Sequence, residues 1–443
     1  MTFSLTIDKL VLGGQGLGRR ADGKVVLVPG ALPGEEVVAA PVEDKKSFVQ
    51  ARLLEVVSPS PWRVTPPCPH YGRCGGCDFQ HVHPARQAEL KDRMLREQLE
   101  RSGFFPRLSL LLEPPVPSPA SFRYRQRIRL HLDQNGRPGF LRQQSHQVEP
   151  VAHCLLARPE LNDVLSCLVA WPLLRKIAPV IAELELLFSP EDGKVVLLLH
   201  LTRTLRPAEK KVTRAMVGLH ASIKHVLVFA AGHGLVDSFC GDEEGRTQPL
   251  LLFSHAVPGG TQRMTVEPGG FCQVNPAQNE QLIALLCDWA RIDGNSRVLD
   301  LFCGMGNFSL PLALRAGSVT GMDLQRSAIR SAVRNAAANG IGNCAFAQNS
   351  ALEGAGQLVA AGQRFDLILL DPPRQGCAEI IPLLPALAAG QIVYISCDPA
   401  TLCRDLLLLE KEGYEVETMR MVDMFPQTHH LETIVSLRLS RPL

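Results

Sequence analysis

The stretch RVLDLFCGMGN, residues 297–307, decides the fold that this sequence predicts. It begins as a β-type run, continues as a glycine turn and leads into an apolar helix candidate at 308–315. In such a unit of strand, turn and helix, the backbone at the start of the helix approaches a ligand closely. The pattern recurs from residue 271 onward, and its repetition predicts a doubly wound α/β domain with a parallel sheet.

An acidic residue after the next strand candidate indicates the type of ligand. Asp323 ends the run 318–322 about 20 residues after the turn, where a carboxylate binds a ribose diol. A dinucleotide fold usually has a third glycine, but Phe308 and Ser309 follow Gly306 here. These residues favour S-adenosylmethionine over NAD. A tight turn without any ligand is the alternative.

Two further strand candidates end in reactive side chains. The run 365–370 leads into Asp371, and the run 391–396 leads into Cys397. Ligands of an open parallel sheet bind beyond the carboxyl ends of its strands. We therefore expect Asp371, Cys397 and the Gly304 turn to share one cleft.

Cys397 is a candidate nucleophile because the segment after it predicts a helix. Asp398 has the character of a helix cap, and Pro399 that of a first helical residue. The positive end of a helix favours the nucleophilic thiolate, whereas the negative charges of Asp371 and Asp398 oppose it. The sequence leaves this balance open. It also leaves open that Cys397 is a buried cysteine without a chemical role.

The rest of the 443-residue chain is expected to form two more domains, since about 150 residues usually make one domain. Short strand candidates with turn signals predict a small β-barrel at 1–57. A proline-rich stretch follows, and residues 58–270 then predict a mixed α/β domain that contains a helix at 84–101. We expect this helix to pack on the catalytic domain, 271–443.

The composition of the chain excludes some classes of protein. The net charge of +2 does not by itself indicate nucleic-acid binding, so any basic surface is local. No apolar run has the roughly 18 to 20 residues of a membrane span, and residues 1–10 lack the features of a signal peptide. We therefore expect a cytoplasmic monomer without a membrane partner.

Cys68, Cys74 and Cys77 form a C-x5-C-x2-C arrangement among glycine and proline turns, so their sulfurs are free to converge. The cytoplasm keeps thiols reduced, and clustered thiols then indicate a metal site rather than disulfides. Zinc and a [4Fe-4S] cluster both accept four thiolates, and the spacing alone does not choose between them. Either one needs a fourth ligand.

Residues 122–129, FRYRQRIR, alternate arginine with other residues. As one strand they would present four arginines on one face. Charge concentrated in this way fits contacts with RNA phosphates. An exposed strand whose arginines form salt bridges is the alternative.

Four ordered motifs make the chain resemble the RNA uridine-5 methyltransferases. They lie at 299–308 (LDLFCGMGNF), 371–376 (DPPRQG), 396–401 (SCDPAT) and 425–432 (FPQTHHLE). The resemblance implies Cys397 as the nucleophile and Glu432 as the base that removes the carbon 5 proton. Carbon 5 of uracil becomes nucleophilic only after a thiolate adds at carbon 6, and the cysteine leaves once that proton is removed.

The same resemblance implies which residues line the cofactor and uracil pocket. They are Gln273, from the stretch FCQVN, together with Phe302, Asn307, Asp323, Ser350 and Asp371. Two of them depart from the commoner pattern, since Asp323 stands where glutamate is usual and Ser350 where asparagine is expected. Both keep a hydrogen-bonding group, so the departures concern only the finer geometry of the pocket.

The resemblance extends over nearly the whole chain. It implies a [4Fe-4S] cluster held by Cys68, Cys74, Cys77 and Cys154, and a TRAM domain, an OB-like barrel that binds RNA, at 1–57. The expected fold class is a Rossmann-like S-adenosylmethionine methyltransferase domain with this barrel and a central mixed α/β iron-sulfur domain. A barrel combined with a cluster favours the members that act on 23S ribosomal RNA.

Three other functions stay open. The family also includes enzymes that modify transfer RNA. A methyltransferase for another RNA base is the second alternative, although exocyclic-amine enzymes typically need Asn-Pro-Pro-aromatic where this chain has DPPR at 371–374, and cytosine enzymes often have a Pro-Cys pair. A non-enzymatic RNA-binding module with a metal cluster is the third.

Overall fold

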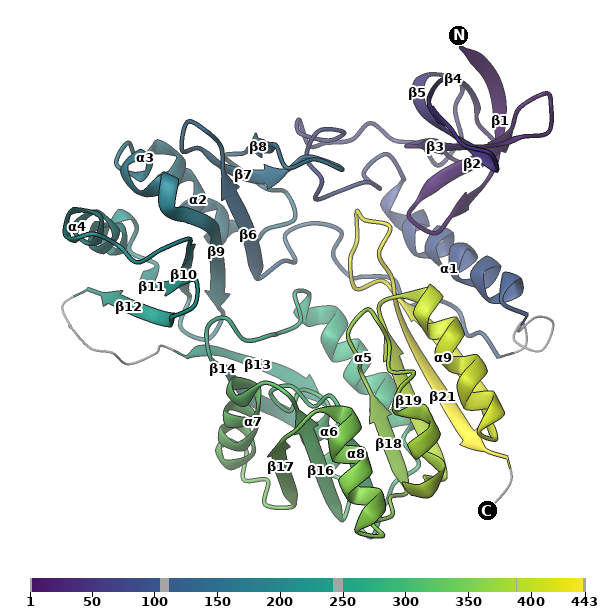
Figure 1. Cartoon of the computed structure of the whole chain (residues 1–443), viewed down its shortest axis with the longest axis vertical. Coiled ribbons are helices and arrows are strands. Elements are labelled where there is room, and N and C mark those ends of the chain that lie inside the picture. The colour runs from purple at the N-terminus through teal and green to yellow at the C-terminus, as the bar shows by residue number, and fades with distance from the viewer. Residues whose placement is uncertain (1, 104–110, 242–249, 388, 441–443) are drawn as a thin grey trace.

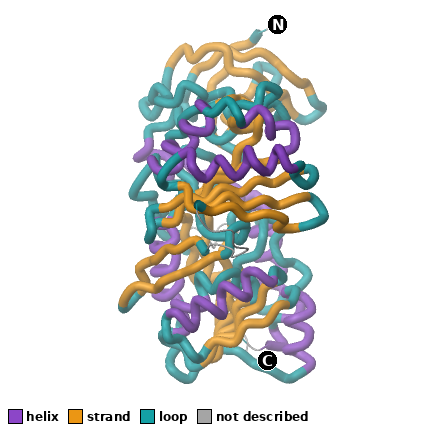
Figure 2. The backbone as a smooth tube through the Cα atoms, turned by 90° about the vertical axis from the view of Figure 1, so that its left-hand side faces the viewer, coloured by secondary structure: helices purple, strands orange, loops and turns teal. Residues whose placement is uncertain are grey.

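The computed structural model describes residues 2–103, 111–241, 250–387 and 389–440. Three β-structures, namely a barrel, a central sheet and a C-terminal sheet, follow one another along the chain, with one hairpin between the last two. Figures 1 and 2 show the barrel and the C-terminal sheet at opposite ends of the molecule. None of the helices within the described ranges has the length and apolar character needed to cross a membrane.

Five strands form a closed barrel at the N-terminus, which confirms the prediction for 1–57. They are β1 (Phe3–Val11), β2 (Gln15–Arg19), β3 (Val25–Pro29), β4 (Glu36–Asp44) and β5 (Phe48–Ser58), in the order β1-β2-β3-β5-β4. Alternate residues face inward, so Leu5, Ile7, Val26 and Val28 are buried while the residues between them are not. The barrel therefore has a small core of its own.

Helix α1 (Pro84–Arg101) lies between the barrel and the C-terminal sheet (Figure 1). Proline at its first position removes a backbone donor that would have no partner, and Gly103, at φ +89°, follows its end. Leu90 packs with Leu10 of β1, whereas Leu95 belongs to the core of the C-terminal domain. The helix therefore contacts both domains.

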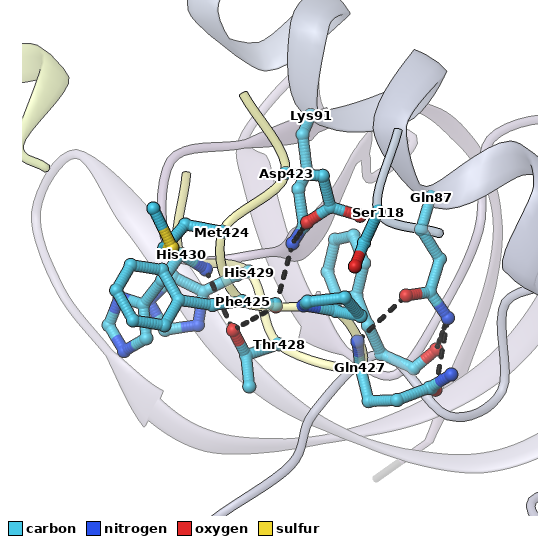
Figure 3. Close-up of polar contacts among 12 residues, drawn as sticks. Gln87, Lys91, Ser118, Asp423, Met424, Phe425, Gln427, Thr428, His429 and His430 are labelled. Atoms are coloured by element: carbon cyan, nitrogen blue, oxygen red, sulfur yellow. Dashed lines mark hydrogen bonds and ion pairs between the residues drawn. The ribbon is translucent and has the colours of Figure 1, made fainter. Parts of the chain in front are cut away.

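The buried face of α1 also carries a charged side chain. Lys91 is fully buried, and its Nζ donates to Asp423 Oδ1 at 2.6 Å and to the carbonyl of Phe425 at 2.9 Å (Figure 3). Asp423 is 4% exposed, so both charges lie away from water. This ion pair fastens α1 to residues 423–431, which we call the 423–431 loop.

A seven-stranded sheet occupies the middle of the chain, in the order β12-β11-β10-β9-β6-β7-β8. Its strands are β6 (Arg127–Leu132), β7 (Pro138–Leu141), β8 (Val148–Pro150), β9 (Ile181–Ser189), β10 (Lys194–Leu201), β11 (Ile223–Ala230) and β12 (Gly234–Cys240), with helices α2 (Pro159–Ala170), α3 (Leu174–Ile177) and α4 (Pro207–Ala215). Helix α2 packs on one face through Val164 and Leu168. Val196 and Leu198 point to the other face, which packs against the following hairpin.

The hairpin of β13 (Leu251–Val257) and β14 (Gly260–Val266) joins the central sheet to the C-terminal domain. Its Val266 packs in one cluster with Met305 of the glycine turn. Its Thr265 backbone N–H donates to the side chain of Asn335 at 2.8 Å. Residues before 271 therefore also form part of the wall of the C-terminal domain.

The C-terminal sheet has seven strands in the order β17-β16-β15-β18-β19-β21-β20. The strands are β15 (Arg297–Asp300), β16 (Ser318–Asp323), β17 (Cys344–Gln348), β18 (Leu367–Leu370), β19 (Gln391–Ser396), β20 (Tyr414–Val422) and β21 (Glu432–Leu439), and the helices are α5 (Pro276–Trp289), α6 (Ser309–Ala313), α7 (Arg326–Ala338), α8 (Ala351–Ala360) and α9 (Pro399–Lys411). Strands β15 to β19 run parallel, which confirms the Rossmann-like class. Strands β20 and β21 add an antiparallel edge that the repeating pattern does not indicate.

The prediction of one arginine-lined strand at 122–129 is wrong. Strand β6 begins only at Arg127, and Arg123 has a positive φ of +58°, which a continuous strand does not allow. Arg127 and Arg129 form ion pairs with Glu185 of β9, as the alternative interpretation expects for these two. The four arginines therefore do not form one phosphate-binding face.

The buried ion pair on α1 leads to a prediction about stability. Lys91→Met leaves the carboxylate of Asp423 buried without a partner, which should lower the free energy of unfolding by about 3–5 kcal/mol. Thermal denaturation of the whole chain measures this loss. Arg93→Met, on the exposed side of the same helix, should cost no more than about 1 kcal/mol because its partner Glu89 is also near the surface. Equal melting temperatures for the two variants would contradict the prediction.

Candidate active site

The glycine turn after β15 is held by the carboxylate of Asp323. Gly304 has φ +54° and Gly306 has φ +88°, so both occupy the left-handed region that favours glycine. The backbone N–H of Gly304 donates to Asp323 Oδ2 at 3.0 Å, and that of Gln325 donates to Oδ1 at 2.7 Å. Asp323 therefore lies at the turn, where the sequence predicts it.

One buried carboxyl group, that of Asp300, and one half-buried carboxyl group, that of Asp371, lie beside this turn. Asp300 is 1% exposed, and the hydroxyl of Ser309 donates to its Oδ2 at 2.6 Å. Burial raises the pKa of Asp300 to about 7. Burial, followed by the nearby charge of Asp300, raises the pKa of Asp371 to about 7 as well. Asp300 was not among the predicted site residues, although an acidic residue inside an apolar strand was a signal that could have found it.

Cys397 and Glu432 are brought together by strand register. Strands β19 and β21 pair antiparallel with Ser396 opposite Thr433, so one further step sets Cys397 opposite Glu432. Glu432 is 5% exposed, and Cys397 is half-buried. Asp371 follows β18, the parallel neighbour of β19, and its charge acts on both groups. The three residues therefore lie near one another at one edge of the sheet.

The electrostatics at this edge favour the protonated forms. Burial and the charge of Glu432 raise the pKa of Cys397 to about 11, while Arg374 opposes the shift and Asp371 adds to it. Burial and the charge of Asp371 raise the pKa of Glu432 well above its ordinary value, and Arg374 again opposes the shift. Burial, together with the neighbouring carboxyl groups, therefore raises the pKa of both Cys397 and Glu432. Arg374 is the cation that limits the rise of these two pKa values. Its position in the motif DPPR was the sequence signal that could have identified it as a site residue.

The first free backbone donors of α9 are occupied by a capping side chain. Asp398 caps the helix, because its Oδ1 accepts from the N–H of Ala400 at 3.0 Å and from that of Thr401 at 2.9 Å. These donors, which would otherwise favour a neighbouring anion, are occupied by the carboxylate. The predicted cap is thus present.

The other predicted pocket residues lie in three places. Asn307 and Asn279 exchange amide hydrogen bonds of 2.9 Å, and both line a small cavity with Gln273 between the hairpin and the central sheet. Phe302 is half-buried and packs against the core of the C-terminal domain. Ser350 follows β17 at the same sheet edge as Asp323, but its hydroxyl caps helix α8.

The four cysteines predicted to bind a metal line one cavity. Cys154 lies far from Cys68, Cys74 and Cys77 in the sequence, but it follows strand β8 of the central sheet and lines the same cavity. Burial raises the pKa of Cys74 to about 11 and that of Cys77 to about 12. Arg125 lines the same cavity, and its Nε has no hydrogen-bond partner among the described residues. Nowhere in the described ranges do three His, Cys, Asp or Glu side chains gather around a single ion position.

The 423–431 loop, which leads directly into Glu432, is held by residues that are far from it in sequence (Figure 3). Five side chains anchor it, each by a hydrogen bond to one residue of the loop. The pairs are Asp78 with His429, Gln87 with Gln427, Lys91 with Asp423, Tyr124 with Pro426, and Asn275 with Met424. Gln427 has a positive φ of +68°, which a non-glycine residue keeps only where its surroundings fix it. Sequence reasoning missed these anchors because none of them belongs to a local pattern.

Comparisons with known proteins identify relatives over the whole chain. The family model described as tRNA (Uracil-5-)-methyltransferase matches residues 257–440. The chain is 34% identical to the 23S rRNA (uracil(1939)-C(5))-methyltransferase RlmD of Alkalilimnicola ehrlichii, over 98% of this chain and 95% of that protein. It is 36% identical to the protein of the same name from Aeromonas salmonicida, with the same two coverages. The solved structure of Pyrococcus abyssi tRNA (uracil-54, C5)-methyltransferase in complex with S-adenosyl-L-homocysteine shares the fold, with a TM-score of 0.73 at 23% identity over 98% of this chain and 99% of that one.

The raised pKa of Cys397 predicts a slow thiol in the free protein. Iodoacetamide should modify Cys397 more slowly than a free cysteine at about pH 7, and the rate should still rise about tenfold per pH unit near pH 10, because only the thiolate reacts. Mass spectrometry of the peptide that contains Cys397 measures this rate. Arg374→Met should slow it further, since it removes the cation that lowers the pKa. A rate that levels off below about pH 9 would contradict the prediction.

Proposed function

Because the chain belongs to the family of RNA (uracil-C5)-methyltransferases, we propose that it transfers a methyl group from S-adenosylmethionine to carbon 5 of a uridine in 23S ribosomal RNA. The observation that carries the chemistry is the strand register that sets Cys397 opposite Glu432. The thiol of Cys397 is suited to add to a uracil ring, and the carboxyl of Glu432 is suited to remove a proton from that ring. Relatives that align over nearly the whole chain support the ribosomal substrate.

The first step of the proposed mechanism is addition of the Cys397 sulfur to carbon 6 of the uracil. The thiol loses its proton, the new bond forms, and the electron pair moves onto the ring as an enolate whose carbon 5 is nucleophilic. Because the pKa of Cys397 is about 11 in the free protein, ionisation is expected to accompany substrate binding. A bound sulfonium would bring positive charge into the acidic cleft, and opposite charge lowers the pKa of a thiol.

The second half of the mechanism restores the aromatic ring. Carbon 5 attacks the methyl group, and S-adenosylhomocysteine leaves. Glu432 then accepts the carbon 5 proton, the ring double bond re-forms, and the bond between carbon 6 and sulfur breaks. A carboxylate whose pKa is raised by burial is a stronger base than an ordinary one once it is ionised.

The cofactor site is proposed at the glycine turn and around the cleft. Asp323 would bind the ribose hydroxyls, since its carboxylate already lies at the Gly304 backbone. The other proposed contacts of the cofactor and the uracil are Gln273, Phe302, Asn307, Ser350 and Asp371. Burial raises the pKa of Asp371 to about 7, which favours its protonated form, and a protonated carboxyl is a donor for a uracil oxygen.

We also propose that the cysteine cavity holds a [4Fe-4S] cluster. Cys68, Cys74, Cys77 and Cys154 would be its ligands, and they fit because four sulfurs line one buried space. They do not surround a single ion position, and a cluster of four irons keeps its thiolates farther apart than zinc does. The unpartnered Nε of Arg125 would face this anionic group. Methyl transfer needs no electron, so we propose a structural role for the cluster. It would stabilise the segment that contacts the 423–431 loop.

A covalent complex with RNA tests the proposed chemistry and the substrate together. With a 23S ribosomal RNA transcript, Glu432→Gln should accumulate an adduct methylated at carbon 5, because sulfur leaves only after the proton is removed, and turnover should fall by about 100-fold or more. Cys397→Ala should form no adduct. Denaturing gel electrophoresis and mass spectrometry of the digested adduct measure both outcomes.

Cys403→Ala is the matched control, since this cysteine is buried inside α9 and should leave turnover unchanged. A robust adduct with Cys397→Ala would overturn the assignment of the nucleophile. An adduct that forms with transfer RNA and not with the ribosomal transcript would replace the proposed substrate.

The cluster has its own test. Protein purified without oxygen should contain about four irons per chain and absorb broadly near about 400 nm. Cys154→Ser should lose most of the iron and the absorbance, whereas Cys167→Ser, which removes a thiol of α2 outside the cavity, should keep both. Zinc in place of iron, or no metal at all, would contradict the proposal.

A further inference from the structure

Asp78 directly follows Cys77 at the end of residues 68–77, which contain three of the four clustered cysteines and which we call the cysteine segment. It connects this segment with the 423–431 loop. Its Oδ1 accepts from the backbone N–H of His429 at 2.7 Å, and its Oδ2 forms a short contact with Nδ1 of the same residue. The backbone N–H groups of Asp78 and Phe79 donate to the carbonyl of Gln427 at 3.2 and 3.0 Å. The end of the cysteine segment, just after Cys77, is therefore fastened to the 423–431 loop at two neighbouring points, Gln427 and His429.

The clamp between Asp78 and His429 has little room to move. Gly14, in the turn between β1 and β2, lies so close that an added Cβ would come within 2.8 Å of the Cβ of His429 and 2.6 Å of the ring of Phe79. On the other side, the ring of His430 lies 4.2 Å from that of His429. The barrel thus packs against the clamp from outside, and the clamp holds one orientation.

Glu432 depends on this loop for its orientation. It is the first residue of β21, where its backbone pairs with Val422 of β20. Within the described part of the chain, no group hydrogen-bonds to its carboxyl. No hydrogen bond fixes this carboxyl, and Glu432 directly follows the loop, so the residues just before β21 help to set where the base lies. An error of about 1 Å in such a position can cost about 100-fold in rate.

We propose that Asp78 is a positioning residue for Glu432, which it orients by clamping His429 and Gln427 in the loop before β21. The inference rests on the proposed function, in which Glu432 removes the carbon 5 proton. Through Asp78, the residues next to the cysteines would then act in one step only, the removal of the carbon 5 proton. Addition of sulfur and transfer of the methyl group do not use Glu432, so loss of the clamp slows the release of methylated RNA and leaves the earlier steps intact.

The experiment measures where the reaction stops. With uridine-containing RNA, Asp78→Ala should accumulate the methylated covalent adduct to about ten times the wild-type level, because the proton is removed slowly. Asp78→Asn should restore much of the turnover, since its amide oxygen still accepts from the His429 N–H. The double variant Asp78→Ala with His429→Ala should be no worse than the single variants, because both remove the same contact.

A second RNA separates positioning from a general loss of structure. RNA with 5-fluorouridine at the target has no carbon 5 proton to remove, so its covalent complex reports only addition and methyl transfer. Asp78→Ala should form this complex at the wild-type rate. Asp92→Ala is the matched control, because this carboxylate on α1 bonds to Arg96 and not to the loop, and it should accumulate no more adduct than the wild type.

Two results would distinguish the failure of this inference from the failure of the proposed function. If Asp78→Ala slows the 5-fluorouridine complex as much as it slows turnover, or accumulates no more adduct than Asp92→Ala, the positioning role is wrong. If the reference variant Glu432→Gln accumulates no adduct, the assignment of the base is wrong instead.

Discussion

The site depends first on the docking of the 423–431 loop. This short loop leads into Glu432, and it is bonded by side chains from the cysteine segment, α1, the residues before β6 and the residues before α5. Gln427 is held at a positive φ and Lys91 is buried with its partner, so the loop reaches this conformation only when all of these parts are folded around it. The active site is therefore a property of the whole chain and not of the C-terminal sheet alone.

Burial of acidic groups then determines the chemical state of the site. The pKa values of Asp300, Asp371, Cys397 and Glu432 are all raised, and burial is the first cause in each case. Uncharged acids cost less to bury than charged ones, so the surroundings of these four groups favour their protonated forms. Arg374 is the protein's own opposing charge. Substrates that bring further positive charge then shift the balance toward the thiolate and the carboxylate.

Particular elements show why some of these features could be predicted. The bounds of α1 and the strands of the barrel follow from local periodicity, turn residues and a first-turn proline, all of which depend on neighbours in the sequence. The prediction from the arginine pattern at 122–129 was wrong, because alternating residues are equally compatible with an irregular segment. In the structure Arg123 has a positive φ and Arg125 lines a cavity. The anchors of the 423–431 loop, such as Gln87, leave no local signal at all.

The sequence by itself determined which reactive groups the protein has and on which strand ends they lie. Cys397, Asp371 and the Gly304 turn end parallel strands, and the rules of an open sheet bring such ends to one edge. Only the tertiary structure decided their protonation, the pairing of Cys397 with Glu432 and the approach of Cys154 to the other cysteines. The physical reason is that burial and strand register arise from residues distant in the chain, whereas periodicity and capping arise from adjacent ones.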